Sequence, residues 1–374
     1  MMLKNVPINV LKPIGDHDDI KSISKVIKSG WWGNGPLTLE LEEKFKLLTN
    51  SKYAVATNSN TSALDMVIKA YNLKGCDILS PTISFATTAI VPIWNQCNTI
   101  LCDVEEKSLN ISIESIKKNL TKNTKAIIVV NMAGVPANIG EIRKIFKGLI
   151  IEDCAHSAYI KGAGEQGDVA LWSFQAVKTM PAGDGGLITL NSKKIYNTLR
   201  SLSWFGIPST FSRIGGSRKG YTWDYDIKNL GYKTYMIDLT ASLCLSQFRK
   251  LKKNLSKRVF IRDYYIKNLR NHFNFLDNSE TVQYMIVKLK KKYQRDNLIN
   301  FLKSKNIQTS VHFKPIHLFK IFKNQYKQTG NFSIANKIWK QILTLPCHPG
   351  VTKQDLKYIC YWINKFFEKS LSKH

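Results

Sequence analysis

The stretch SFQAVKTMPAGDGG, residues 173–186, contains one lysine, Lys178, between two apolar segments. The flanking segments, VALWSF (169–174) and GLITL (186–190), have the length and composition of buried strands. Asp184 is the only other charged residue in the stretch. Lysines are mostly exposed in folded proteins, so a lysine between two expected core strands points to a specific role.

Upstream of this stretch, short apolar runs alternate with helical patterns. The first strand is predicted at YAVAT (53–57), and the last before the lysine segment at LIIED (149–153). Alternation over about 150 residues favours an open α/β sheet with helices on both faces. Ligands of such folds bind at the carboxyl ends of the strands.

The C-terminal part has a different pattern. One long helix is predicted from residue 241 to residue 269, and it would connect to a second domain. A strand at VQYMIVKL (282–289), a helix at RDNLINFLKSKN (295–306) and a closing helix from about residue 353 predict a smaller α+β unit. We therefore expect a large domain over residues 1–245 and a small domain over residues 246–374.

Length and composition exclude several classes of protein. The chain has 374 residues, of which 44% are hydrophobic and 22% charged, which is ordinary for a soluble globular protein with a large core. No apolar run reaches the roughly 18 residues that span a membrane. The first residues, MMLKNVPINVLKPIGD, lack the apolar segment of a signal peptide. We expect a cytoplasmic protein without a membrane partner.

The seven cysteines form no CxxC pair and the seven histidines no HExxH motif, so we expect no metal site. The formal net charge of +28 has three interpretations: a solvated surface, attraction of an anionic substrate, or nucleic-acid binding. The basic residues are spread along the whole chain without a nucleic-acid-binding motif, so we expect no nucleic-acid partner.

Polar residues follow three of the predicted strands. Asp153 ends one strand, although a helix N-cap is the alternative role for it. Ser173 and Lys178 follow another, and NSNTSAL (58–64) opens a helix whose N-terminal N–H groups suit a phosphate. Pyridoxal phosphate (PLP) requires such a set: a lysine that binds it, an acid that keeps the ring nitrogen protonated, and a phosphate pocket.

With these residues, the chain resembles the DegT/StrS family of PLP-dependent sugar aminotransferases, from about residue 6 to the C-terminal helix. The lysine segment matches the family pattern S-F-x-x-x-K, four residues, then G-[ED]-G-G. The resemblance implies an α/β fold of type I among PLP-dependent transferases, with a mixed, mostly parallel sheet in the large domain and a smaller C-terminal α+β domain. The other matching stretches are SGWWGNGP (29–36), SPTISFATTA (80–89), IIEDCAHS (150–157), LGYKTYM (230–236), VHFKPIH (311–317) and LTLPCHP (343–349).

The resemblance also implies roles for individual residues. Lys178 is the implied catalytic lysine that binds the cofactor, and Asp153 is the implied partner of the pyridine nitrogen. Asn60 stands where the family usually has glycine, and because asparagine tolerates a left-handed backbone, the turn can still form. The other implied cofactor contacts are His156 near the 3-hydroxyl, Phe85 on the ring face, Asn60, Thr61 and Ser173 at the phosphate, and Lys233 from the neighbouring subunit.

Substrate contacts are expected from Trp32, His312 and His317, although both histidines could instead have a packing role. The family's common His-Tyr is His312-Phe313 here, so the hydrogen bond of that hydroxyl is not expected. From its charge and glycines, the loop SRIGGSRKG (212–220), which contains Arg213, could bind the phosphates of a substrate, and an exposed basic loop is the alternative.

The implied activity is amino transfer from an amino acid, usually L-glutamate, to a keto group of a nucleotide-linked deoxysugar. Pyridoxamine phosphate (PMP) would be the intermediate form of the cofactor. The implied assembly is a homodimer with shared active sites. One alternative is a sugar dehydratase of the same fold, but such relatives have histidine in place of Lys178. The other is a non-enzymatic regulatory or nucleic-acid-binding protein.

Overall fold

The structure, a computed structural model, describes residues 4–207, 226–227, 229–276, 281–290, 294–326 and 328–371. Within these ranges, seven strands form a larger sheet in the order β1-β7-β6-β5-β4-β2-β3, and three form a smaller sheet in the order β10-β9-β8. The strands are β1 (Tyr53–Thr57), β2 (Asp77–Pro81), β3 (Asn98–Cys102), β4 (Thr124–Val130), β5 (Leu149–Asp153), β6 (Val169–Ser173), β7 (Gly186–Leu190), β8 (Phe273–Phe275), β9 (Met285–Leu289) and β10 (Ile342–Leu345).

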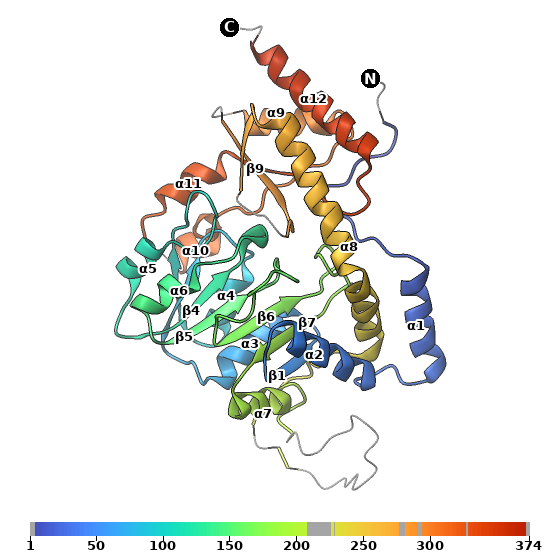
Figure 1. The fold of residues 1–374 in the computed structure, drawn as a ribbon. Coiled ribbons are helices and arrows are strands. Elements are labelled where there is room, and N and C mark those ends of the chain that lie inside the picture. The colour runs from blue at the N-terminus through green and yellow to red at the C-terminus, as the bar shows by residue number, and fades with distance from the viewer. Residues whose placement is uncertain are drawn as a thin grey trace.

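The helices surround both sheets (Figure 1). None of those in the described ranges combines the length and the apolar character that crossing a membrane requires. They are α1 (His17–Ser29), α2 (Pro36–Leu48), α3 (Asn60–Ala70), α4 (Thr87–Trp94), α5 (Ile113–Asn119), α6 (Ile139–Ile145), α7 (Lys193–Leu202), α8 (Asp238–Leu269), α9 (Arg295–Lys303), α10 (Lys320–Asn324), α11 (Ser333–Trp339) and α12 (Lys353–Leu371), with 3-10 turns η1 (Met132–Gly134) and η2 (Ile316–Leu318).

The larger sheet is mixed and mostly parallel, as predicted. Strands β2 to β6 run parallel to their neighbours, whereas β7 is antiparallel to both β6 and β1. Successive residues of β4 alternate between two cores: Ile127 and Val129 pack with α5 and α6, whereas Ala126 and Ile128 pack on the side of α3. A strand with apolar residues on both faces needs cover on both, which is why helices flank the sheet on each side.

The long helix α8 connects the two sheets (Figure 1). Cys244 and Leu245, near its start, pack in the core that contains α2, whereas Tyr265 and Leu269, near its end, pack with β9 and α12. The side chain of Asp238, the first residue of α8, accepts hydrogen bonds from the N–H groups of Leu37 and Thr38 at the start of α2. The predicted boundary at residue 245 falls inside α8 and stays a prediction.

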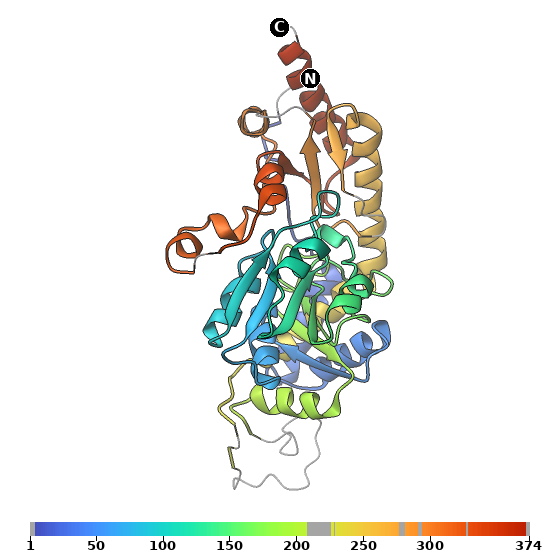
Figure 2. The ribbon, with the colours of Figure 1, turned by 90° about the vertical axis from the view of Figure 1, so that its left-hand side faces the viewer.

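Residues 4–14, the N-terminal strap, lie along the C-terminal part of the molecule, and both ends of the chain lie at this end (Figure 2). The N–H of Ile8 donates to Asn306 O at 2.8 Å, and the N–H of Cys347 donates to Val10 O at 3.2 Å. Lys4 forms an ion pair with Asp355. The start of the chain therefore packs with the smaller sheet, although the sequence groups it with the large domain.

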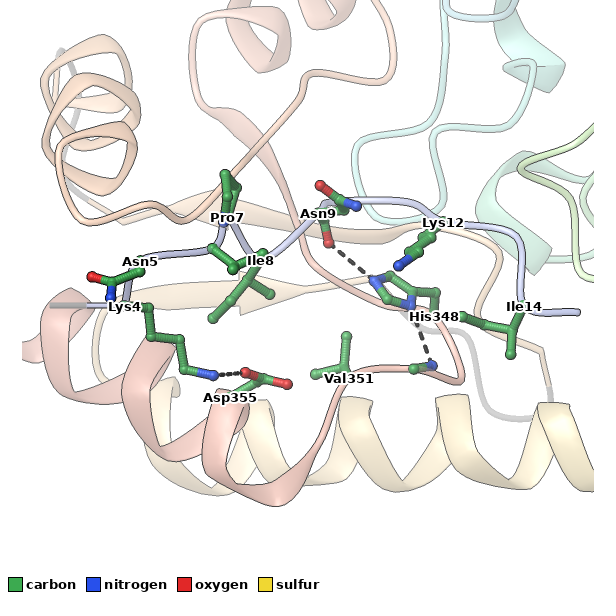
Figure 3. A pocket seen from close by; sticks show the side chains of 12 residues that line it. Lys4, Asn5, Pro7, Ile8, Asn9, Lys12, Ile14, His348, Val351 and Asp355 are labelled. Atoms are coloured by element: carbon green, nitrogen blue, oxygen red, sulfur yellow. Dashed lines mark hydrogen bonds and ion pairs between the residues drawn. The ribbon is translucent and has the colours of Figure 1, made fainter.

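A cavity of about 420 Å³ lies under the strap (Figure 3). His348 lines it, and its Nε2 lies 3.2 Å from Asn9 O. Its Nδ1 accepts from the N–H of Gly350 at 3.2 Å. These partners require the neutral tautomer with the proton on Nε2. Burial, together with the positive charge of Arg258, lowers the pKa of His348 to about 4.

We predict that this histidine makes the fold less stable in mild acid. Between its ordinary pKa of about 6.5 and the folded value of about 4, the unfolded chain binds a proton that the folded chain excludes. Stability contributed by neutral His348 is therefore lost as the pH falls through this window. Urea unfolding at pH 7 and pH 5 should show that His348→Gln removes about 1 kcal/mol of the pH-dependent loss.

The matched control is His17→Gln, because His17 is exposed. It should keep the pH dependence of the unmodified protein. The prediction would be contradicted if the free energy of unfolding fell equally between pH 7 and pH 5 in the His348→Gln variant and in the unmodified protein.

Candidate active site

The predicted residues meet at one edge of the larger sheet. Asp153 is the last residue of β5 and Ser173 the last of β6. Ser173 pairs with Gly186 at the start of β7, and Gly186 pairs in turn with Thr57 at the end of β1. The carboxyl ends of β1, β5 and β6 thus lie together, at the kind of edge where ligands bind in α/β folds.

Asp153 is buried, and its Oδ1 accepts two hydrogen bonds. The donors are the N–H of Ala155 at 3.0 Å and Asn60 Nδ2 at 3.2 Å. Burial raises the pKa of Asp153, and the nearby Lys178 counteracts part of that rise. Residues 154–168 are all described and contain no helix, so the alternative of Asp153 as a helix N-cap is wrong.

Lys178 lies in the loop between β6 and β7, and its side chain is partly buried. Burial lowers the pKa of its amine to about 8, although the charge of Asp153 opposes this shift. The N–H of Ala182 donates to Phe174 O at 2.7 Å across the base of the loop. The carbonyl of Val177, next to the lysine, accepts from Gln283 Nε2 at 2.9 Å. These two hydrogen bonds fix the backbone of the loop that carries Lys178.

The start of α3 provides an anion-binding geometry beside Ser173. Ser59 caps the helix by accepting from the N–H of Ser62, whereas the N–H groups of Asn60 and Thr61 have no acceptor among the described residues. A Cβ at Gly186 would lie 2.5 Å from the carbonyl carbon of Ser59, so only glycine lets β7 come this close.

Two oxygens near this helix start are left without partners among the described residues. Asn60 Oδ1 is buried without a hydrogen bond, and the hydrogen bonds that Asp153 accepts from described residues both go to its Oδ1, which leaves Oδ2 available. An amine, an available carboxylate oxygen and open helix N–H groups fit PLP. The side chain of Asn60 is directed to Asp153, so its backbone N–H is the part that suits a phosphate.

Aromatic rings pack around the lysine. His156 is buried, with its Nδ1 3.4 Å from the N–H of Ala133, and its ring centroid lies 6.2 Å from that of Phe313. Phe85 is 65% exposed, and its ring lies 6.3 Å from Phe313. His312 is buried, and its Nδ1 lies 2.8 Å from Thr344 Oγ1. The structure thus brings His156, Phe85 and His312 together.

Two site residues were not predicted from the sequence: Gln283 and Tyr284. Gln283 holds the carbonyl beside Lys178, and the ring of Tyr284 stacks on His312 with centroids 3.9 Å apart. Both lie in VQYMIVKL, which the sequence predicted as a strand of a separate domain. The polar Gln283 next to an apolar strand was the available signal, and it was too weak to assign a role.

Two other expected site residues make their hydrogen bonds with residues outside this cluster. His317 has Thr82 Oγ1 at 2.6 Å and Asn336 Oδ1 at 3.0 Å on its two ring nitrogens, and its ring stacks on Phe332, which favours a packing role. Trp32 is 53% exposed, and its Nε1 donates to Ile27 O.

Lys233 is exposed, on a segment whose Thr234 O accepts from the N–H of Asn58, just before α3. Its side chain has no partner among the described residues. Arg213, in the predicted basic loop, lies outside the described residues.

The charge of Asp153 gives a testable effect on the amine. Asp153→Asn removes a negative charge that stabilises the ammonium form, so the pKa of Lys178 should fall below about 8. The pH dependence of acetylation at Lys178, followed by peptide mass spectrometry on cofactor-free protein, measures this pKa. Asp184→Asn is the control, because Asp184 lies exposed in the same loop. A pKa that rises or stays constant in Asp153→Asn would contradict the electrostatic coupling.

Comparison with known proteins identifies the family. The model of the DegT/DnrJ/EryC1/StrS aminotransferase family matches residues 13–364. The chain is 30% identical to the uncharacterized protein MJ1066 of Methanocaldococcus jannaschii, with 95% of this chain and 96% of that protein covered. It is 28% identical to the spore coat polysaccharide biosynthesis protein SpsC of Bacillus subtilis, with 92% and 93% covered.

The fold is also found among solved structures. The putative sugar aminotransferase Spr1654 of Streptococcus pneumoniae, in its PMP form, superposes with a TM-score of 0.89 at 24% identity, over 98% of this chain and 100% of that one. The same protein has a PLP form. The predicted family, fold and cofactor are confirmed: the chain belongs to the DegT/DnrJ/EryC1/StrS family of PLP-dependent sugar aminotransferases, with fold type I.

Proposed function

We propose that this enzyme transfers an amino group from L-glutamate to a keto group of a nucleotide-linked deoxysugar, for a surface glycan or a related amino sugar. The observation that carries the proposal is the pair of Lys178 and Asp153 at the carboxyl edge of the sheet, beside the open N-terminus of α3. Its relative SpsC is named for spore coat polysaccharide biosynthesis, which supports a glycan product.

The residues that would hold the cofactor follow from the geometry of the edge. When bound, PLP supplies an electron-withdrawing ring that stabilises negative charge on the substrate carbon. Asp153 would pair with the ring nitrogen, and the buried His156 would lie beside the ring. Phe85 would cover one face. The phosphate would take the N–H groups of Asn60 and Thr61 and the hydroxyl of Ser173.

Lys178 would bind the cofactor and then move the proton in each half-reaction. With a pKa of about 8, roughly a tenth of the amine is free at pH 7, enough to accept a proton at Nζ and return it. Burial raises the pKa of Asp153, whereas the N–H of Ala155, the charge of Lys178 and the amide of Asn60 favour its carboxylate form. The group that would move the proton in both half-reactions is thus one whose pKa burial has already lowered toward neutrality.

Neutral histidines border the space where a substrate would enter. Burial lowers the pKa of His312 to about 4, with the charge of Lys178 adding to the shift, so its ring is uncharged at neutral pH. His312 can therefore orient a sugar hydroxyl without competing with Lys178 for the proton. Phe313 brings an apolar ring to this wall in place of the hydroxyl of a tyrosine.

A direct test uses the two half-reactions. L-glutamate should convert the PLP form to the PMP form, and a nucleotide-linked keto sugar should restore the PLP absorbance in the visible range. Free keto sugars serve as the comparison and should react at least about tenfold less efficiently. Lys178→Ala should lose turnover by several orders of magnitude, since it removes the proton-transfer group. Equal reaction with free sugars would overturn the nucleotide assignment, and loss of water from the sugar without amino transfer would favour a dehydratase.

We also propose a homodimer in which Lys233 completes the partner's site. The exposed ammonium of Lys233 supports this, because it has no partner among the described residues and lies beside the turn that opens α3. In an isologous dimer, the same segment of each chain reaches the other chain.

Mixing chains tests the shared site. Lys178→Ala and Lys233→Ala subunits, each inactive alone, should regain up to about a quarter of the normal activity after exchange, because a mixed dimer has one site with both substitutions and one with neither. Lys178→Ala mixed with an inactive Asp153→Asn chain is the control. Both changes lie in the same chain's site, so every site of that mixed dimer carries one substitution and no activity should return. Recovery in the control alone, or an active monomer in sedimentation, would contradict the model.

A further inference from the structure

Tyr284 occupies the centre of the aromatic wall around Lys178. It is 3% exposed, and it comes from the segment just before β9, in the smaller sheet. Its ring stacks on His312 with centroids 3.9 Å apart and planes 9° from parallel. It also meets the ring of His156 edge-on, with centroids 4.8 Å apart. One side chain from the C-terminal part thus contacts both histidines of the site.

The same ring covers the amine of Lys178. Nζ lies 5.8 Å from the ring centroid of Tyr284, within the range of a cation–π contact. An aromatic face holds an ammonium in one place and keeps water from it, and it gives the free amine no hydrogen bond that would compete with proton transfer. The ring face attracts the ammonium form, as the charge of Asp153 does, but unlike Asp153 it also keeps water from the amine.

The backbone that carries Tyr284 is fixed on both sides. Arg258, in α8, is buried and donates from Nη1 to the carbonyls of Val282 and Gln283 at 3.1 and 3.2 Å. On the other side, the N–H of Gln283 donates to Ala133 O at 3.3 Å. A Cβ at Gly134 would lie 2.2 Å from Thr281 O, so the two backbones are in close contact.

The segment is also tied to the lysine loop itself. Gln283 Nε2 donates to the carbonyl of Val177, the residue before Lys178, at 2.9 Å. Gln283 therefore holds the residue before the lysine, and Tyr284 lies over the amine of the lysine itself. A tyrosine that only filled the core would require neither the hydrogen bond from Gln283 to the lysine loop nor the contact with the amine.

We propose that Tyr284 is a positioning residue, which holds the Lys178 amine in a dry, fixed place against His312 for proton transfer. The inference rests on the proposed role of Lys178. The charged and titratable groups that face the amine and this ring are Asp153 on β5, His156 after β5, His312 before η2, and Arg258 on α8. The two histidines are neutral at pH 7, because burial and the charge of Lys178 lower their pKa values.

Two substitutions separate the ring from its hydroxyl. Tyr284→Phe keeps the aromatic face, and Tyr284→Ala removes it and leaves a space with polar walls that water can enter. Burial is the largest cause of the lowered pKa of Lys178, so hydration of the amine in Tyr284→Ala should outweigh the loss of the cation–π contact and raise this pKa from about 8 by one unit or more. Acetylation of Lys178 against pH in cofactor-free protein measures this without any turnover.

Turnover provides the second measurement. In Tyr284→Ala, kcat should fall about tenfold or more, while KM for both substrates stays within about threefold, because proton transfer rather than binding is impaired. Tyr284→Phe should keep kcat within about twofold of the value for the unmodified enzyme. It should also keep the pKa of Lys178 within about 0.3 units. If the alanine variant does not fold, Tyr284→Asn serves the same comparison, because its smaller, polar side chain also brings a hydrated surface to the amine.

Phe322→Ala is the matched control, because Phe322 is a ring of the same hydrophobic core that is equally buried. It should lower stability but leave kcat and the pKa of Lys178 unchanged. The proposal is overturned if Tyr284→Ala keeps the normal pKa and kcat, or if Phe322→Ala changes both to the same extent. Retained turnover in Lys178→Ala would instead refute the proposed role of the lysine, a separate outcome.

Discussion

The burial of one amine next to one carboxylate is the constraint on which the site depends. Lys178 is partly buried, which disfavours its charge, whereas the charge of Asp153 favours it. A buried charge without a partner is costly, so the fold has to hold the two groups close. It does so by placing Asp153 at the end of β5 and Lys178 on a loop closed by Phe174 and Ala182. The pKa of the amine is therefore about 8, so most of it is still in the ammonium form at neutral pH.

That pair cannot be set up by the larger sheet alone. The rings that keep water from Lys178 come from residues 284 and 312–313, in the C-terminal part of the chain. Helix α8 packs in both cores, and its Arg258 holds the segment before β9. The smaller sheet therefore does more than bury its own core, because it forms one wall of the site. Any movement of that sheet would change the hydration of the amine.

The sequence predicted the parts whose pattern is local. Alternating apolar strands and helices gave the larger sheet, and the spacing around Lys178 and Asp153 gave the centre of the site. Strands β8 and β10, helices α7, α10 and α11, and the packing of the N-terminal strap were not predicted, because β8 and β10 have three and four residues and the strap pairs with residues about 300 positions away. Tyr284 was missed for the same reason: its role comes from a tertiary contact with Lys178, not from its neighbours in the chain.

Electrostatics also explains how the site can contain two histidine rings close to Lys178. His156 and His312 both lie close enough to Lys178 for its charge to lower their pKa values, and burial lowers them further. Two more cations there would repel the ammonium and lower the pKa of Lys178 further. Neutral imidazoles avoid this cost and still provide hydrogen-bonding nitrogens. The protonation state at the site is therefore governed by the lysine–carboxylate pair.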